Sequence, residues 1–91
     1  MKVLWTAEAE ADRQEIFDYI AVEDAVAAIR LDETFSVAAG RLGEMPYLGK
    51  PGRIAGTREL LPHPSYRLVY EIYAEAIWIL ALVHAARRWP P

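Results

Sequence analysis

The segment YRLVYEIYAEAIWILALVHAAR, Tyr66–Arg87, determines the fold predicted for this chain. Residues 66–73 alternate between two faces, as in a β-strand that turns one face to a core. Residues 76–83 are nearly all apolar, which is typical of a central strand covered on both faces. The dipeptide Ala74-Glu75 between them predicts a hairpin turn. One face of the first strand carries Tyr66, Leu68, Tyr70 and Ile72, and the other carries Arg67, Val69, Glu71 and Tyr73.

A third strand and a long irregular segment precede this pair. Residues 57–61 predict a short strand and residues 62–65 a turn, so a β-meander is expected at about 57–84. Residues 44–53 hold two prolines and two glycines, a composition that excludes regular structure. Residues 49–53, GKPGR, superficially resemble a phosphate-binding loop. We reject that interpretation, because no strand precedes them and no helix follows.

A helical hairpin is predicted for the first half of the chain, at about residues 6–42. Thr6 is a suitable N-cap for a helix over Ala7–Ala21. The connection Glu23-Asp24 caps a second helix that ends near Gly40 and Gly43. In the first helix, the residues that recur at helical spacing are Ala9, Asp12, Ile16, Tyr19 and Ile20. In the second, one continuous apolar stripe is formed by Ala28, Leu31, Phe35, Ala38 and Leu42.

With a short strand at residues 2–5, the order of elements is β-α-α-β-β-β, an α+β class fold in one domain spanning residues 1–91. The chain has no cysteine and two histidines, and no ligand spacing suggests a metal or cofactor site. No apolar run approaches the roughly 20 residues of a membrane span, and the N-terminus lacks a signal-peptide pattern, so we expect a cytoplasmic protein.

The distribution of charge and the hydrophobic fraction both bear on whether the chain has partners. Residues 1–49 carry four basic and ten acidic side chains, whereas residues 50–91 carry six basic and three acidic ones. The favoured interpretation of this distribution is that acidic side chains cover exposed helix faces, and the alternative is a basic half that contacts an anionic partner. The hydrophobic fraction of 54% is high for so small a chain. Part of that apolar surface is therefore expected to face a partner.

Several segments in order give the chain a family resemblance. They are the helical hairpin stripe, Pro46-x-x-Gly49, Gly56-Thr57-Arg58-Glu59-Leu60, Tyr66-Arg67-Leu68-Val69-Tyr70 and Ile79–Arg87. Over almost its whole length the chain resembles the RelE/ParE toxin superfamily. The resemblance implies a twisted antiparallel sheet with the two helices packed on one face. It also implies a growth-inhibiting toxin of a bacterial type II toxin–antitoxin module, held inactive by a small antitoxin protein.

Two activities are implied by this resemblance, and each assigns different residues. RelE-like members cleave messenger RNA on the ribosome without a metal, using cationic side chains and proton-transfer groups. The matching positions here are Arg58, Arg67 and Arg87. One family lysine corresponds to Leu60, and a family tyrosine beyond the last strand has no counterpart. ParE-like members poison DNA gyrase through protein contact. For that activity the target or partner contacts are His84, Arg87, Arg88 and Trp89.

Each candidate also has a purely structural interpretation. Arg67 lies mid-strand, where it can pair across strands with Glu59 or with a side chain on the face that carries Glu71. Arg58 can pair with a carboxylate in the same way. Arg87 and Arg88 in a tail fit solvated side chains, and His84 fits a hydrogen-bonded structural histidine. Trp89 can cap the edge of the sheet, and Trp5 and Trp78 fit core positions.

Three functions therefore remain open from the sequence. The favoured one is a ParE-like toxin acting on DNA gyrase, because the lysine and tyrosine of the cleaving branch are missing and the end of the last strand reads LVHAAR. The alternatives are a RelE-like endoribonuclease and a non-toxic member that only binds its antitoxin. In each case we expect the antitoxin's C-terminal segment to fold over the helical hairpin and a sheet edge.

Overall fold

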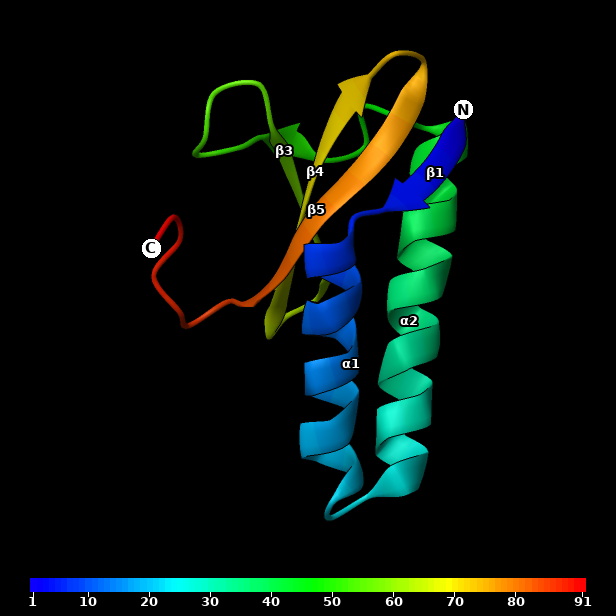
Figure 1. Cartoon of the computed structure of the whole chain (residues 1–91), viewed down its shortest axis with the longest axis vertical. Coiled ribbons are helices and arrows are strands. Elements are labelled where there is room, and N and C mark those ends of the chain that lie inside the picture. The colour runs from blue at the N-terminus through cyan, green and yellow to red at the C-terminus, as the bar shows by residue number, and fades with distance from the viewer.

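The computed structural model describes residues 1–91 (Figure 1). Helix α1 spans Ala7–Ala21 and α2 spans Ala25–Glu44, so both helices lie where the sequence predicts them. The hydroxyl of Thr6 accepts the backbone N–H of Ala9 at 3.2 Å, and the carboxylate of Asp24 accepts that of Ala27 at 3.0 Å. These bonds satisfy N–H groups that a helix start leaves free, which is why both helices begin where they do.

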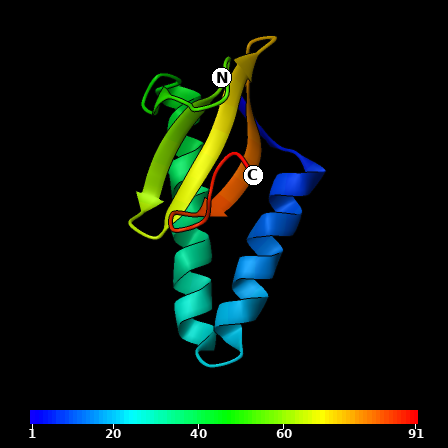
Figure 2. The ribbon, with the colours of Figure 1, turned by 90° about the vertical axis from the view of Figure 1, so that its left-hand side faces the viewer.

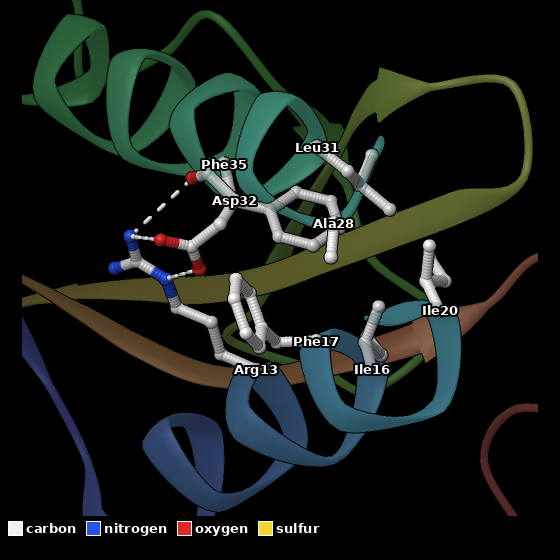
Figure 3. Close-up of a pocket in the computed structure, with 8 residues that line it drawn as sticks. All are labelled: Arg13, Ile16, Phe17, Ile20, Ala28, Leu31, Asp32 and Phe35. Atoms are coloured by element: carbon white, nitrogen blue, oxygen red, sulfur yellow. Dashed lines mark hydrogen bonds and ion pairs between the residues drawn. The ribbon is translucent and has the colours of Figure 1, made fainter. Parts of the chain in front are cut away.

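The two helices form an antiparallel hairpin with an apolar interior (Figures 1 and 3). Its lining side chains come from both helices: Ile16, Phe17, Ile20, Ala28, Leu31 and Phe35. On the sheet-proximal side of this interior, the guanidinium of Arg13 meets the carboxylate of Asp32 at 2.6 Å. The same guanidinium lies 4.8 Å from the centre of the Trp5 ring. Arg13 therefore ties together α1, α2 and the strand before them.

The sheet has five strands in the order β1-β5-β4-β3-β2. β3 (Arg58–His63), β4 (Tyr66–Tyr73) and β5 (Ala76–His84) form the antiparallel meander that the sequence predicts. β1 (Lys2–Trp5) instead pairs in parallel with β5, so the sheet is mixed and the expectation of a fully antiparallel sheet is wrong for this strand. The N–H of Thr6 donates to the carbonyl of Ile79 at 3.0 Å, which fixes the direction of β1 at its junction with α1.

Two other strand bounds differ from the prediction. β2 (Lys50–Pro51) is a two-residue strand inside the segment predicted to be irregular. Its pairing with Arg58 and Glu59 depends on the neighbouring strand rather than on a local pattern. β3 also continues to His63, beyond the expected end at Leu61. Pro62 is tolerated there because that part of β3 has no strand on its outer side.

The main core lies between the helices and one face of the sheet. Its nine buried members are Ala9, Phe35, Ala39, Leu42, Leu68, Tyr70, Ile77, Ile79 and Leu82. The predicted stripe of α2 is confirmed, with Leu31 partly buried and the others buried. Among the residues that recur at helical spacing in α1, Tyr19 is 81% exposed and lies off the buried face. Tyr19 falls in the last turns of α1, where the hairpin extends past the end of the sheet (Figure 1).

The C-terminal tail, residues 85–91, folds over the opposite face of the sheet (Figure 2). We call this the open face because no helix covers it. Val69, Ala81 and Val83 form a small buried cluster there, and Trp89 packs against it. Trp89 thus covers a face of the sheet rather than an edge. Of the other tryptophans, Trp5 packs against the main core and Trp78 is half-buried. The chain contains no helix with the length and apolar composition needed to cross a membrane.

Candidate functional site

A groove at one end of the sheet gathers several of the polar residues that the sequence singles out. It lies between α1 and the Tyr66 and His84 ends of β4 and β5, with a volume of ≈ 360 Å³. Its lining residues are Asp12, Glu15, Ile16, Tyr19, Tyr66, Leu82, His84 and Arg87. We call it the His84 groove. The groove holds the carboxylates of Asp12 and Glu15 and the guanidinium of Arg87. It can therefore form polar contacts with a partner of either charge.

His84 is exposed at the mouth of this groove, but its ring is fixed in place. Its Nδ1 accepts the backbone N–H of Ala86 at 3.1 Å. The ring packs edge-on against Tyr66, with 5.3 Å between ring centres, and Tyr66 packs in turn against Phe35 at 5.4 Å. His84 therefore makes a hydrogen bond of the kind that its structural interpretation expects. Its Nε2 makes no hydrogen bond within the chain and remains available to a partner.

Asp12 also lines this groove, although its spacing in the sequence placed it with the helix residues and not in a site. Its Oδ2 accepts the backbone N–H of Leu82 at 3.1 Å. This bond satisfies the edge of β5 beyond the end of β1. Burial raises the pKa of Asp12, against the lowering effects of the Leu82 N–H and of Arg87's positive charge. The signal in the sequence was an acidic side chain placed on an otherwise apolar helix stripe.

The three arginines assigned to RNA cleavage do not meet at one place. Paired residues in neighbouring strands share a face, and Arg58 pairs with Tyr70, which faces the helices. Arg67 lies three residues before Tyr70 and so faces the opposite way, onto the open face. Arg87 lies in the tail and lines the His84 groove.

Arg58 and Arg67 are also engaged by contacts within the chain. The Nε of Arg58 donates to the carbonyl of Gly49 at 3.0 Å, and its guanidinium lies 5.1 Å from the centre of the Tyr47 ring. The Nε of Arg67 lies 2.9 Å from Oε1 of Glu59, and both residues are buried. The predicted Arg67–Glu59 cross-strand pair is thus confirmed. The predicted carboxylate partner of Arg58 is wrong, because its partners are carbonyls of the 46–49 loop.

The buried ion pair is not fully satisfied. The Nε of Arg67 is within ion-pair distance of Glu59 but is not aligned for a hydrogen bond, and Nη1 of Arg67 has no acceptor. The carboxylate of Glu59 has a second partner, because its Oε2 accepts the backbone N–H of Arg53 at 2.8 Å. The guanidinium of Arg53 in turn donates to the carbonyl of Trp89 at 3.3 Å. The loop that contains Arg53 and the C-terminal tail therefore cover the open face together.

The predicted contact residues of the tail divide between two faces. His84 and Arg87 line the His84 groove, whereas Trp89 lies on the open face against Val69 and its neighbours. Arg88 lies between them in the chain, exposed and without an ion pair. No three side chains of the metal-binding types gather in the chain.

A family of known proteins matches this sequence and this geometry. The sequence model of the ParE toxin of type II toxin–antitoxin systems, parDE, matches residues 3–89. A protein of Sinorhizobium fredii named as a toxin, Y4kP, is 38% identical over 90 residues, which cover 98% of this chain and 93% of that protein. Toxin RelE2 of Caulobacter vibrioides is 36% identical over 86 residues, covering 94% and 97%.

Two solved structures share the fold. The chain matches a chain of the chromosomal ParDE TA system from P. aeruginosa with a TM-score of 0.82 and 22% identity, covering 92% of this chain and 95% of that one. It matches the YoeB/ParE toxin from Agrobacterium tumefaciens with a TM-score of 0.65 and 18% identity, covering 92% and 98%. At these identities the matches establish the α+β fold alone.

Proposed function

The chain belongs to the ParE toxin family of type II toxin–antitoxin systems, and on that premise we propose that it stops bacterial growth by poisoning DNA gyrase. A cognate antitoxin is the partner that membership of this family implies. The identity of the target, DNA gyrase, is the more specific part of the proposal. It rests on the geometry of the chain's cationic residues.

The observation that carries this proposal is the separation of Arg58, Arg67 and Arg87. Metal-free RNA cleavage needs fixed cations around one phosphate, together with groups that remove and supply protons. Arg58 and Arg67 lie on opposite faces of the sheet and are held by Gly49 and Glu59. This arrangement favours a toxin that acts by protein contact, which requires complementary surface rather than a converging set of charges.

We assign the contact to the His84 groove and the tail beside it. His84 offers a free Nε2 on a ring fixed by Tyr66, and Arg87 is exposed beside it. Arg88 extends the positive charge outside the groove. A ring that is already held in place loses little side-chain entropy on binding, and arginine is enriched among the residues that dominate the energy of protein interfaces.

A DNA supercoiling and cleavage assay with purified gyrase tests the proposal. We expect the wild-type chain to inhibit supercoiling and to accumulate cleaved DNA. His84→Ala and Arg87→Ala are each expected to require at least about tenfold more toxin, the loss typical of an interface anchor. Lys2→Ala is the matched control, because Lys2 is exposed on β1 away from the groove.

Two results would overturn the proposal. One is an unchanged gyrase reaction at toxin concentrations that stop growth. The other is the appearance of codon-phased cuts in ribosome-bound message, read by primer extension after a pulse of expression, which would assign the chain to RNA cleavage. A growth curve of cells that express the chain without its antitoxin distinguishes both from a non-toxic antitoxin-binding protein.

A further inference from the structure

His63 and His84 occupy equivalent positions on either side of Tyr66. In the register of the sheet, Tyr66 on β4 pairs with His63 on β3 and with His84 on β5. Paired residues share a face, so the three rings form a row across one end of the sheet, on the side where Tyr66 packs against Phe35 of α2. The centre of the Tyr66 ring lies 5.9 Å from that of His63 and 5.3 Å from that of His84. We call His63, Tyr66 and His84 the aromatic row.

The two histidines of the aromatic row make the same backbone contact. Nδ1 of His63 accepts the backbone N–H of Ser65 at 3.0 Å, and Nδ1 of His84 accepts that of Ala86 at 3.1 Å. A neutral imidazole carries one N–H, so a ring whose Nδ1 accepts a hydrogen bond holds its proton on Nε2. Both histidines therefore present the same tautomer, with Nε2–H as a donor.

Neither Nε2–H is used within the chain. Both histidine rings are exposed, and neither Nε2 has a hydrogen-bond partner. Because neighbouring strands lie about 4.8 Å apart, the two donors stand about 10 Å apart across three strands. The turns themselves require only an acceptor near Nδ1, which an asparagine would also provide. Turn formation therefore explains one nitrogen of each ring and leaves the other free for a partner.

The surroundings of His84 indicate which acceptor the partner supplies. The carboxylates of Asp12 and Glu15 line the groove beside it, and neither forms an ion pair in the chain. Burial raises the pKa of Asp12, and among the neighbouring charges Glu15, which raises it, outweighs Arg87, which lowers it. An incoming carboxylate would be repelled there. A neutral carbonyl oxygen can accept from Nε2–H without that cost.

We propose that His63 is a second contact residue of the toxin, which donates with His84 to carbonyl oxygens of the target on either side of Tyr66. The inference rests on the proposed function in taking DNA gyrase as that target. It extends the contact surface from the His84 groove across β4 to β3. The rings are already held by a backbone hydrogen bond and by the edge of Tyr66, so little side-chain freedom is lost on binding.

Asparagine and glutamine at position 63 separate the two roles of the imidazole. His63→Asn keeps an oxygen near the place of Nδ1, which can accept the N–H of Ser65, but has no donor near the place of Nε2. His63→Gln puts an amide N–H near the place of Nε2 and loses the turn bond. A contact residue predicts that toxin activity falls in His63→Asn and is largely kept in His63→Gln. A purely structural residue predicts the reverse.

The activity is read with the full chain in the gyrase supercoiling assay. His63→Asn is expected to require about fivefold more toxin, the loss of one neutral hydrogen bond, while its urea unfolding matches the wild type. His63→Gln should stay within about twofold in activity but unfold at a lower urea concentration. His63→Asn/His84→Asn should require about 25-fold more toxin if the two contacts are independent. Lys2→Ala, exposed on β1, is the control with wild-type activity.

Two further measurements keep this test separate from the gyrase proposal. The ¹⁵N shifts of the imidazole nitrogens in the free chain should show the Nε2–H tautomer for both histidines, and an Nδ1–H form of His63 would overturn the inference. Growth arrest at equal expression level ranks the same variants against whatever target the toxin has. If the wild type arrests growth without affecting gyrase, only the identity of the target fails.

The inference is wrong if His63→Asn is as active as the wild type in both assays. It is equally wrong if the loss of activity is confined to His63→Gln, because that result assigns the ring to the turn alone. A wild-type chain that neither inhibits gyrase nor arrests growth overturns this inference together with the proposed function.

Discussion

At the level of single residues, the pairing of Arg67 explains why this arginine is a poor candidate for phosphate chemistry. Moving it onto a phosphate would leave Glu59 as an unpaired charge under the loop and tail. Leaving a buried charge without its partner typically costs about 3–5 kcal/mol. A ligand would have to compensate for that cost before it gained anything from the guanidinium. An arginine at this position could bind a phosphate freely only if this face of the sheet were uncovered and Glu59 were absent.

Asp12 gives the fold a pH dependence with a definite sign. Burial raises the pKa of its carboxyl in the folded chain above the ordinary value of 3.8, and the charge of Glu15 acts in the same direction. The stability contributed by the protonated form is therefore complete below the unfolded-state pKa and is lost as the pH rises through the folded-state pKa. Above that pH, the wild-type chain carries the cost of a partly buried negative charge.

We therefore expect Asp12→Asn to gain stability relative to the wild type as the pH rises. Asparagine keeps an oxygen that can accept the N–H of Leu82, but it does not ionise. The difference in the free energy of unfolding should grow upward from about pH 4 and level off, as urea titrations at several pH values would show. Asp18→Asn, which removes one exposed charge from the same helix, is the control. Identical pH profiles for the two variants would contradict the expectation.

At the level of elements, Gly49 and Gly40 have opposite roles. An added Cβ at Gly49 would lie 2.7 Å from the carbonyl oxygen of Glu59 and 2.8 Å from the ring of Tyr70. The N–H of Gly49 donates to the hydroxyl of Tyr70 at 2.9 Å, so the loop cannot retreat without losing this bond. Gly40 lies inside α2 and has open space on the side where a Cβ would project.

Alanine substitutions should separate these roles. Gly49→Ala is expected to lower the free energy of unfolding by about 1–3 kcal/mol, because β3 and the Tyr70 ring must move. Gly40→Ala is expected to raise it by about 0.5–1 kcal/mol, because alanine restricts the unfolded chain and favours helix. Chemical unfolding of the two variants beside the wild type measures both signs. A loss of stability in Gly40→Ala would show that this turn of α2 is more constrained than its surroundings indicate.

The local patterns predicted the elements well because the elements obey local rules. Caps at Thr6 and Asp24 define the starts of the helices, and alternation along residues 66–73 defines β4 and its core face. The parallel direction of β1 was not predictable in this way, since its partner β5 lies more than seventy residues further along the chain. β2 was not predicted for a different reason, namely that two residues carry no periodicity of their own.

The candidate site was only partly accessible to sequence reasoning. His84 and Arg87 were identified from the end of the last strand, and they do lie together in the groove. That Arg58 and Arg67 face opposite sides follows from the pairing of β3 with β4, which the sequence left undefined. Asp12 and Glu15 reach the groove through helix packing, and no pattern around them identifies their neighbours in β5.

At the level of the whole molecule, the helices cover one face of the sheet and the tail covers part of the other (Figures 1 and 2). The tail is held by a small number of contacts. The N–H of Ala85 donates to the carbonyl of Ser65 at 2.7 Å, and the guanidinium of Arg53 donates to the carbonyl of Trp89. The Trp89 ring packs on the open-face cluster. A short segment with so few bonds depends mainly on its one large apolar side chain.

Trp89→Ala is therefore expected to lower the free energy of unfolding by about 2 kcal/mol, less than the 3–5 kcal/mol typical of a fully buried aromatic because the ring is only half-buried. Binding of an apolar dye should increase in the folded variant, since Val69, Ala81 and Val83 lose their cover. Arg88→Ala, at the exposed neighbouring position, should stay within about 0.5 kcal/mol of the wild type. If Trp89→Ala were as stable as Arg88→Ala and bound no additional dye, the cluster would be buried by the strands and the Arg53 loop alone.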